Sequence, residues 1–241
     1  MISLKNVSCS FENRTVLQNI NLQIDAHLTI LGANGSGKST LAKAICSLIE
    51  FEGEIKIEHQ KMENLSLIER AKTLSYIPAK LEIYDSYITV EEFVLLGCFA
   101  YKKSFFDYSE QDKNSTQESL EFLKISHLKK SSVASLSSGE QQLTLIAQAL
   151  TQRSKIIIFD EPTANLDPQN SKIIAQHIKK LKKNHQIILI THDLHLASFI
   201  ETPIAFVKEK QIHYYKKDFF KDETLQELYG VRFQSMVVKY D

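Results

Sequence analysis

The chain has 241 residues, which fits one large domain or a domain with a smaller lobe attached. Hydrophobic residues make up 43% and charged residues 24%, so the chain can bury a sizeable core and is expected to be globular. Lysine plus arginine and aspartate plus glutamate each number 29, and this zero formal charge lacks the basic excess typical of DNA- or RNA-binding proteins.

The cysteines and the hydropathy of the chain indicate its compartment and its relation to a membrane. Cys9, Cys46 and Cys98 lie far apart, with neither metal-ligand spacing nor an even disulfide pattern, which favours a reducing cytosol. The N-terminus lacks a cationic start followed by an apolar signal core. No apolar run approaches the roughly 20 residues that a membrane-spanning helix needs. A role at a membrane would therefore need another chain inside the bilayer.

The first third of the chain is predicted to be rich in strands. Apolar and polar residues alternate over residues 2–24, which predicts antiparallel strands, and residues 28–31 form a short apolar strand that runs into Gly32. Helical spacing of apolar residues follows over 40–49. Two further strands are predicted at 53–57 and 74–77.

The middle and the end of the chain are predicted to alternate helices and strands. Residues 88–150 have mostly helical spacing, with the polar stretch 109–119 as an exposed connector. Uninterrupted apolar runs at 156–159 and 187–190 are typical of parallel strands that are covered on both faces. A helix over 168–182 separates them, with Asp167 as a favourable N-cap and Pro168 at the first helical position. The tail is predicted to hold a hairpin (204–207 with 211–215), a helix (222–229) and a last strand (234–238).

The expected fold class is therefore α/β: a core with a parallel sheet, an N-terminal antiparallel β part, and an inserted helical lobe at about 85–150. We expect residues 1–241 to form a single domain of this kind.

A phosphate-binding loop is predicted between the strand at 28–31 and the next helix. The residues that fit the G-x-x-x-x-G-K-[ST] pattern, and the next one, are Gly32, Ala33, Asn34, Gly35, Ser36, Gly37, Lys38, Ser39 and Thr40. The glycines let backbone N–H groups point at phosphate oxygens, and the helix adds its positive N-terminal end. Lys38 would neutralise the β- and γ-phosphates, and Ser39 would offer a hydroxyl to Mg²⁺. Alone, this motif also fits kinases and GTPases.

Two acids end the apolar run at 156–159. Asp160 and Glu161 would be costly beside a buried strand without compensation, and a bound Mg²⁺ would provide it. Asp160 is then the expected metal ligand, as in the second Walker motif, and Glu161 is placed to polarise a water for attack on the γ-phosphate. The alternative is that both acids simply leave the sheet into solvent.

The stretch Leu136-Ser137-Ser138-Gly139-Glu140-Gln141 discriminates among nucleotide-binding families. It resembles the LSGGQ signature of ABC ATPases, and it precedes Asp160 by one helix and one strand, as in that family. A Ser cap alone would be the default interpretation. The resemblance, which extends over about residues 2–215, implies that Ser137, Ser138, Gly139 and Glu140 contact the ATP held by the opposite subunit of a homodimer.

The resemblance assigns three further positions. Asp167, in Ala164-Asn165-Leu166-Asp167, corresponds to the D-loop between paired subunits. His192 corresponds to the switch histidine that holds the γ-phosphate and the attacking water. Phe11 corresponds to the aromatic residue that stacks on adenine, although from its own sequence context it could equally belong to the core. His192 and His195 could also face one way as metal ligands, but the sequence contains no further ligand cluster beside them.

The sequence departs from the family pattern at three places. Ala79, in Tyr76-Ile77-Pro78-Ala79, replaces the usual Q-loop glutamine, which touches Mg²⁺ and water, and Lys80 is a possible substitute. Ser138 and Glu140 replace the usual first glycine and the glutamine of the signature. The short Asp25-Ala26-His27 replaces the usual Gly-Glu turn before the phosphate-loop strand, and these changes suggest slow or partner-dependent hydrolysis.

The resemblance implies an ATP- and Mg²⁺-dependent subunit on the cytoplasmic face of the cell membrane. It would power separate permease subunits, act with a second copy of itself and a substrate-binding protein, and bind no nucleic acid. Residues 88–97 and 228–231 are similar to importers of iron chelates, haem and cobalamin. The alternatives are an exporter subunit, a soluble ABC ATPase of DNA repair or translation, and a regulatory module with little hydrolysis.

Overall fold

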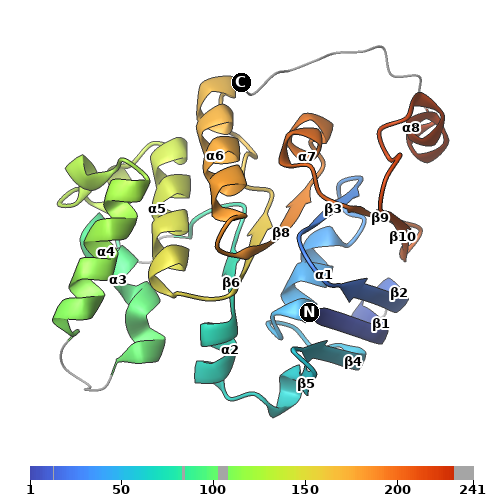
Figure 1. Ribbon diagram of the computed structural model, residues 1–241, viewed down its shortest axis with the longest axis horizontal. Coiled ribbons are helices and arrows are strands. Elements are labelled where there is room, and N and C mark those ends of the chain that lie inside the picture. Colours follow the sequence, from blue (N-terminus) through green and yellow to red (C-terminus); the bar gives the residue numbers. More distant parts are fainter. Residues whose placement is uncertain (13, 83–84, 103–107, 231–241) are drawn as a thin grey trace. The chain divides into compact units, whose positions relative to one another are not determined.

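The computed structural model describes residues 1–12, 14–82, 85–102 and 108–230, which belong to two compact units (Figure 1). The first unit combines residues 1–64 with the chain from Gln186 onward. The second unit is the continuous segment Leu65–His185.

An antiparallel sheet lies at the start of the first unit. It contains β1 (Ile2–Phe11), β2 (Arg14–Ile24), β4 (Glu52–Ile57) and β5 (Gln60–Lys61), in the order β2-β1-β4-β5. Ile2 lies opposite Ile24 on one side and Ile57 on the other, and all three are buried. The predicted antiparallel strands are confirmed, and their alternation buries one face of the sheet.

A second set of strands in the same unit is centred on β3 (Leu28–Gly32), all of whose residues are buried. β8 (Gln186–Thr191) and β9 (Ile204–Lys208) pair with β3 in parallel, and β10 (Gln211–Tyr215) pairs antiparallel with β9. The helix α1 (Lys38–Ile45) packs against strands of both sets, and α7 (Leu194–Ile200) packs against β8. The predicted strands and the 204–215 hairpin are confirmed.

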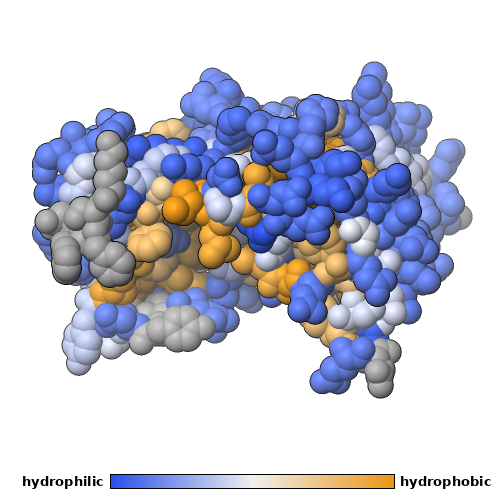
Figure 2. Space-filling model, turned by 90° about the horizontal axis from the view of Figure 1, so that it is seen from below, coloured by the Kyte–Doolittle hydropathy of each residue, from blue (hydrophilic) through white to orange (hydrophobic). Residues whose placement is uncertain are grey.

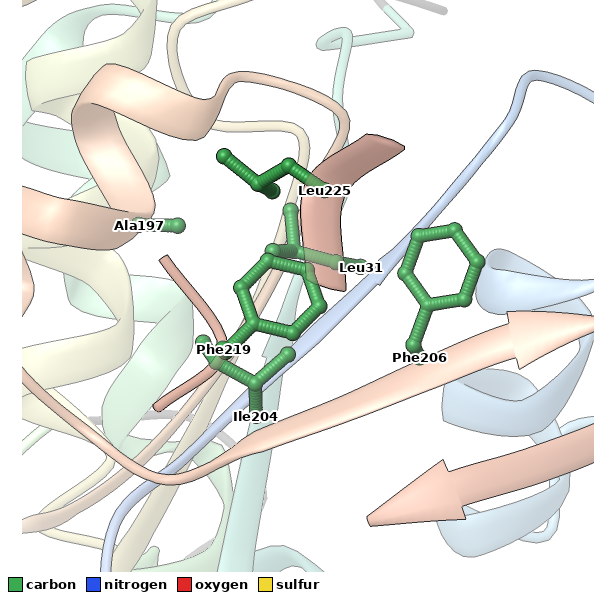
Figure 3. Packing of buried hydrophobic residues seen from close by; sticks show 6 residues of the cluster. All are labelled: Leu31, Ala197, Ile204, Phe206, Phe219 and Leu225. Carbon is green, nitrogen blue, oxygen red and sulfur yellow. The ribbon is translucent and has the colours of Figure 1, made fainter. Parts of the chain in front are cut away.

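A hydrophobic cluster joins the C-terminal helix α8 (Asp222–Tyr229) to this sheet (Figure 3). Its buried members come from β3, α7, β9 and α8 and from the segment before α8: Leu31, Ala197, Ile204, Phe206, Phe219 and Leu225. The ring centroid of Phe206 lies 5.9 Å from that of Phe219 and 5.3 Å from that of Tyr229. Burial of these aromatic rings fixes the strand β3 that leads into the phosphate loop.

The second unit is organised around α5 (Ser138–Thr151), most of whose residues are buried. α5 packs against α3 (Val90–Leu95), the 3₁₀ helix η2 (Leu96–Tyr101), α4 (Glu110–Phe122) and α6 (Pro168–Leu181). It also contacts β6 (Leu74–Ile77), which pairs in parallel with β7 (Ile156–Asp160), while α2 (Leu67–Thr73) packs on β6 and η2. Two short 3₁₀ turns, η3 (Ser126–Leu128) and η4 (Val133–Ser135), also belong to this unit, whereas η1 (Met62–Asn64) lies in the first unit.

Two sequence-based predictions are wrong in detail. The polar stretch 109–119 is not a connector but most of α4, which begins with a capping box between Ser109 and Asp112 and buries Thr116 and Leu120. The helix predicted over 40–49 is α1 at Lys38–Ile45, and it ends early because Ser47 adopts a left-handed conformation with φ 52°. The last predicted strand, 234–238, lies outside the described residues.

No helix in the described part of the chain is both long enough and apolar enough to cross a bilayer.

Candidate functional site

The phosphate loop connects β3 to α1 through a backbone that requires glycine at residue 37. Gly37 is the N-cap of α1 with φ 103° and ψ 9°, and a Cβ atom there would lie 2.9 Å from Val16 Cγ1. The first helical hydrogen bond runs from Leu41 N–H to the Gly37 carbonyl at 2.9 Å. The start of α1 therefore faces the loop with the N–H groups and the partial positive charge of a helix N-terminus.

A buried cation and a buried hydroxyl lie in this loop. Lys38 is 5% exposed, and its Nζ donates hydrogen bonds to the carbonyl oxygens of Gly32 at 2.9 Å and Ala33 at 3.0 Å. The Ser36 Oγ is buried and has no hydrogen-bond partner among the residues that the structure describes. A buried hydroxyl without a partner costs about 1–3 kcal/mol, so this loop is suited to bind an anion that accepts from Ser36 and pairs with Lys38.

A pocket of about 860 Å³ opens beside the loop within the first unit. From the sequence, Phe11 could be either a core residue or an adenine-stacking residue. It is 49% exposed and lines this pocket together with the phosphate loop. The predicted residues on its wall are Phe11, Gly35, Ser36, Gly37, Lys38, Ser39 and Thr40. Gly32, Ala33 and Asn34 do not line the pocket. The carbonyl oxygens of Gly32 and Ala33 instead accept the hydrogen bonds of Lys38.

Sequence reasoning missed six further residues that line the pocket. These are Glu12, Arg14, Thr15, Val16, Glu209 and Lys210. The Lys210 carbonyl accepts from Gln18 N–H at 3.1 Å, and Gln211 Nε2 donates to the Gln18 carbonyl at 2.8 Å. These bonds hold the β9–β10 turn against β2. The place of residues 12 and 14–16 close to Phe11 in the sequence was the available signal, whereas nothing in the sequence pointed to the distant turn.

The two predicted acids of the second unit have distinct environments. Asp160 is 3% exposed at the end of β7, and Tyr76 on β6 donates its hydroxyl to Asp160 Oδ2 at 2.6 Å. Glu161 follows with φ 49°, a left-handed conformation that is unfavourable for a residue with a side chain. Such strain often occurs at functional sites. The contact of Tyr76 with Asp160 was not anticipated from the sequence.

The signature stretch opens α5 with a capping box. The Ser137 hydroxyl donates to Glu140 Oε2 at 2.7 Å, the Ser137 N–H donates to the same oxygen at 2.8 Å, and Glu140 N–H lies 3.5 Å from Ser137 Oγ. These bonds to Ser137 hold the pKa of the Glu140 carboxyl below its usual value. The extra negative charge at residue 140 is thus fixed over the first turn of α5, and Ser138 beside it is exposed.

Gly139 brings this stretch against the start of α6. A Cβ atom at Gly139 would lie 2.7 Å from Asn170 Cγ, so only glycine fits without moving that side chain. Asn170 Nδ2 donates to Asp167 Oδ2 at 2.6 Å, and Asp167 Oδ1 caps α6 by accepting from the N–H groups of Gln169 and Asn170. Asn170, which sequence reasoning missed, therefore links Gly139 to Asp167.

His192 follows β8 in the first unit and is exposed. Asp193 caps α7 by accepting from the N–H groups of His195 at 2.8 Å and Leu196 at 3.2 Å. This cap places His195 in the first turn of the helix. Within residues 1–12, 14–82, 85–102 and 108–230, no group of three or more His, Cys, Asp or Glu residues is arranged to hold a metal.

A family model described as ABC transporter matches residues 17–164, more than half of the chain. The chain belongs to the ABC transporter family. It is 32% identical over 237 residues to an uncharacterized ABC transporter ATP-binding protein of Methanocaldococcus jannaschii, covering 96% of this chain and 92% of that protein. A zinc import ATP-binding protein of Pasteurella multocida is 33% identical, with 82% of this chain and 69% of that protein covered. A probable iron chelatin transport ATP-binding protein of Helicobacter pylori is 30% identical, with 88% and 85% covered.

Solved structures support the same assignment. A dimeric ATP-binding cassette in a post-hydrolysis state, bound to ADP and phosphate, matches with a TM-score of 0.78 and 27% identity over 90% of this chain and 98% of that chain. The expected ABC ATPase fold is confirmed. The protein is the ATP-binding subunit of an ABC transporter, a family whose cassettes pair with each other and with membrane-spanning permease chains and hydrolyse ATP to power transport.

Proposed function

We propose that this subunit powers the import of a metal chelate, with an iron complex as the first candidate. The observation that carries the ATP-driven part is the pocket in which Phe11, the start of α1, Lys38 and the unpartnered Ser36 hydroxyl line one space. Support for this cargo comes from relatives whose names include iron chelatin and zinc, and from the similarity of residues 88–97 and 228–231 to chelate importers. The whole chain would act as one ABC ATPase domain.

ATP would bind with its adenine on the half-exposed Phe11 ring and its phosphates over the loop. Aromatic stacking tolerates any base, so this contact contributes affinity more than selectivity. Ser36 would donate to a phosphate oxygen and lose its desolvation penalty, while Lys38 would exchange a carbonyl bond for a charged phosphate oxygen.

The donor groups on the chain suit Mg²⁺, which prefers hard oxygen ligands. The Ser39 hydroxyl lies on the pocket wall, and Asp160 supplies a buried carboxylate that Tyr76 holds in place. These two residues would hold the ion, which when bound neutralises charge on the transferring phosphate.

Hydrolysis would depend on Glu161 and His192. Glu161 would accept a proton from the attacking water, and its strained backbone would fix the direction of the carboxylate. The exposed His192 would hold the γ-phosphate and the water.

The second copy of the chain would complete each site. Ser137, Ser138, Gly139 and Glu140 at the start of α5 would face the ATP of the partner, and the contact of Gly139 with Asn170 would keep Asp167 in register with them. The likeness to a dimeric cassette supports this arrangement.

The permease would dock in an apolar groove between α2, η2 and α5, at the cytoplasmic face of the membrane. The groove has a volume of about 280 Å³ and includes Leu67, Ile68, Leu96 and Phe99, with Leu67 81% and Phe99 69% exposed. In the left half of Figure 2, hydrophobic side chains reach the surface. Exposed apolar side chains that gather in a groove mark interaction sites. Because ABC cassettes pair with permease chains, a short amphipathic helix of a permease is the proposed occupant of this groove.

The test of the function is to tag the chain, extract it gently from native membranes, and identify the chains that co-purify. A polytopic membrane protein, together with a chelate-binding protein, supports the proposal. Recovery only with ribosomes or DNA, or with a permease of another cargo class, contradicts it.

A matched pair of variants tests the groove in the same experiment. Phe99→Asp should abolish recovery of the membrane chain, because a charge cannot be buried in an apolar contact without a partner. The control Tyr214→Asp changes a 49% exposed aromatic residue on β10 and should leave recovery unchanged. Equal recovery with both variants would place the permease elsewhere.

A further inference from the structure

Tyr76 connects the strand before the altered Q-loop to the acid at the end of the neighbouring strand. β6 and β7 run in parallel with Tyr76 opposite Ile158. Side chains two residues apart on a strand point to the same face, so Asp160 lies on the face that Tyr76 shares with Ile158. The long phenol side chain reaches one step along the sheet and donates to Asp160 Oδ2 at 2.6 Å.

The hydrogen bond runs from the Tyr76 phenol to the Asp160 carboxylate. A phenol has one O–H donor, and here it points to Oδ2 of Asp160. The Asp160 residue is 3% exposed. Charge-assisted O–H···O⁻ bonds of this length are among the stronger hydrogen bonds in proteins. The bond therefore limits rotation of the Asp160 carboxylate about its Cβ–Cγ bond.

The same segment carries the residue that departs from the family pattern. Ala79 is the second residue after β6, and its methyl group can neither accept nor donate a hydrogen bond. The segment after β6 thus has no polar side chain at the position where the family has glutamine. Its attachment to the acid comes instead from the strand itself, through Tyr76.

We propose that Tyr76 is a positioning residue that orients the Asp160 carboxylate for its divalent cation and so links the Q-loop segment to the metal site without a glutamine. This inference rests on the proposed role of Asp160. Loss of the hydroxyl would leave the fold in place, weaken binding of the ion and lower turnover at limiting metal. The affinity for ATP itself depends on the other unit's loop and would change little.

The test compares Tyr76→Phe with wild type in the full-length protein. Binding of Mn²⁺ is measured by electron paramagnetic resonance in the presence of a non-hydrolysable ATP analogue. The expected result is about tenfold weaker Mn²⁺ binding, equivalent to about 1.4 kcal/mol, because without the phenol hydroxyl the carboxylate must be oriented when the ion binds. The kcat at low Mg²⁺ should fall and recover at high Mg²⁺, with the KM for ATP unchanged.

Ser75→Ala is the matched control. Ser75 is the adjacent residue of β6, points to the opposite face, and makes a buried hydrogen bond to Ser154 at 2.8 Å. It should lower the melting temperature without altering Mn²⁺ binding. Tyr76→Met, which keeps an apolar side chain of similar length, should behave like Tyr76→Phe.

The outcomes separate the positioning role of Tyr76 from the proposed ATPase function. Mn²⁺ binding by Tyr76→Phe equal to that of wild type overturns the positioning role and leaves the ATPase intact. Unfolding of both Tyr76 variants under conditions where Ser75→Ala is folded also overturns it, because the hydroxyl would then be structural. A wild-type protein that binds neither the analogue nor Mn²⁺ refutes the proposed function together with this inference.

Discussion

Replacing Gly97 with alanine should destabilise the second unit because η2 lies too close to α5 for a side chain. A Cβ atom at Gly97 would be 2.1 Å from the Gln148 carbonyl oxygen and 2.2 Å from Thr151 Oγ1. The carbonyl belongs to the backbone of α5 and cannot rotate away. The Thr151 hydroxyl donates to the Val94 carbonyl at 2.8 Å, so its displacement breaks a bond between α5 and α3, the helix that leads into η2.

The magnitude follows from these two contacts. Forcing a methyl group into a close-packed site costs about 1–3 kcal/mol, and the lost hydrogen bond adds about 1 kcal/mol. The expected loss of stability is therefore about 2–4 kcal/mol. For a chain of this size each kcal/mol lowers the melting temperature by about 2–4 °C, so we expect a decrease of about 5–15 °C.

Thermal and urea denaturation followed by circular dichroism measure this loss. Gly230→Ala is the control, since a Cβ atom there meets nothing within 4 Å and only the left-handed φ of 70° is unfavourable. That strain costs about 1 kcal/mol. The double variant with Thr151→Ala should recover only part of the loss, because the Gln148 carbonyl remains. A Gly97→Ala protein as stable as the control would refute the close approach of η2 and α5.

Three further substitutions have expected outcomes. Lys38→Met should abolish ATP binding, as measured by calorimetry, while leaving the fold intact, because the apolar side chain still fills the space of the buried lysine stem. Glu140→Gln preserves both acceptor bonds of the capping box but removes the charge. It should leave the melting temperature within about 2 °C and tighten ATP-dependent dimerisation, measured by light scattering; weaker dimerisation would mean that the carboxylate itself is needed. Burial, followed by the charges of Lys180 and Lys124, lowers the pKa of His177 from 6.5 to about 4. The unfolded chain then binds a proton that the native protein does not, so stability should fall as the pH drops from about 6.5 to about 4. His177→Leu should flatten that part of the pH profile in urea titrations, and an unchanged profile would place the acid sensitivity elsewhere.

The phosphate loop and the strands were accessible from the sequence because each has a strong local cause. The spacing of Gly32, Gly37 and Lys38 fixes a turn between a buried strand and a helix, and uninterrupted apolar runs predict β7 and β8 regardless of the rest of the chain. These features need no knowledge of distant contacts.

The helix α4 was missed because its stability comes from its ends and its packing. Its residues are polar on average, and the apolar period that predicts a helix is weak. The reciprocal bonds between Ser109 and Asp112, and the ion pair of Asp112 with Arg153 at 3.4 Å, supply what the period does not. An S-x-x-D pattern before a polar run was the signal that could have found it.

The contacts that refine the site were inaccessible for a different reason. Tyr76 with Asp160, Asn170 with Gly139, and Lys210 beside the phosphate loop each bring together residues from separate elements. Motifs name residue types along the chain, whereas these contacts depend on strand register, helix packing and a hairpin turn. The sequence supplied Asp160 and Gly139, and only the fold supplied their neighbours.

The central claim is that the chain binds ATP at its phosphate loop and hydrolyses it with Glu161. The most direct measurement compares ATP binding and phosphate release by wild type and Glu161→Gln in the same preparation, with the permease present. The account predicts that the variant binds ATP like wild type and releases phosphate at least about 100-fold more slowly, the usual contribution of a general base. Phosphate release at the wild-type rate by Glu161→Gln would contradict it.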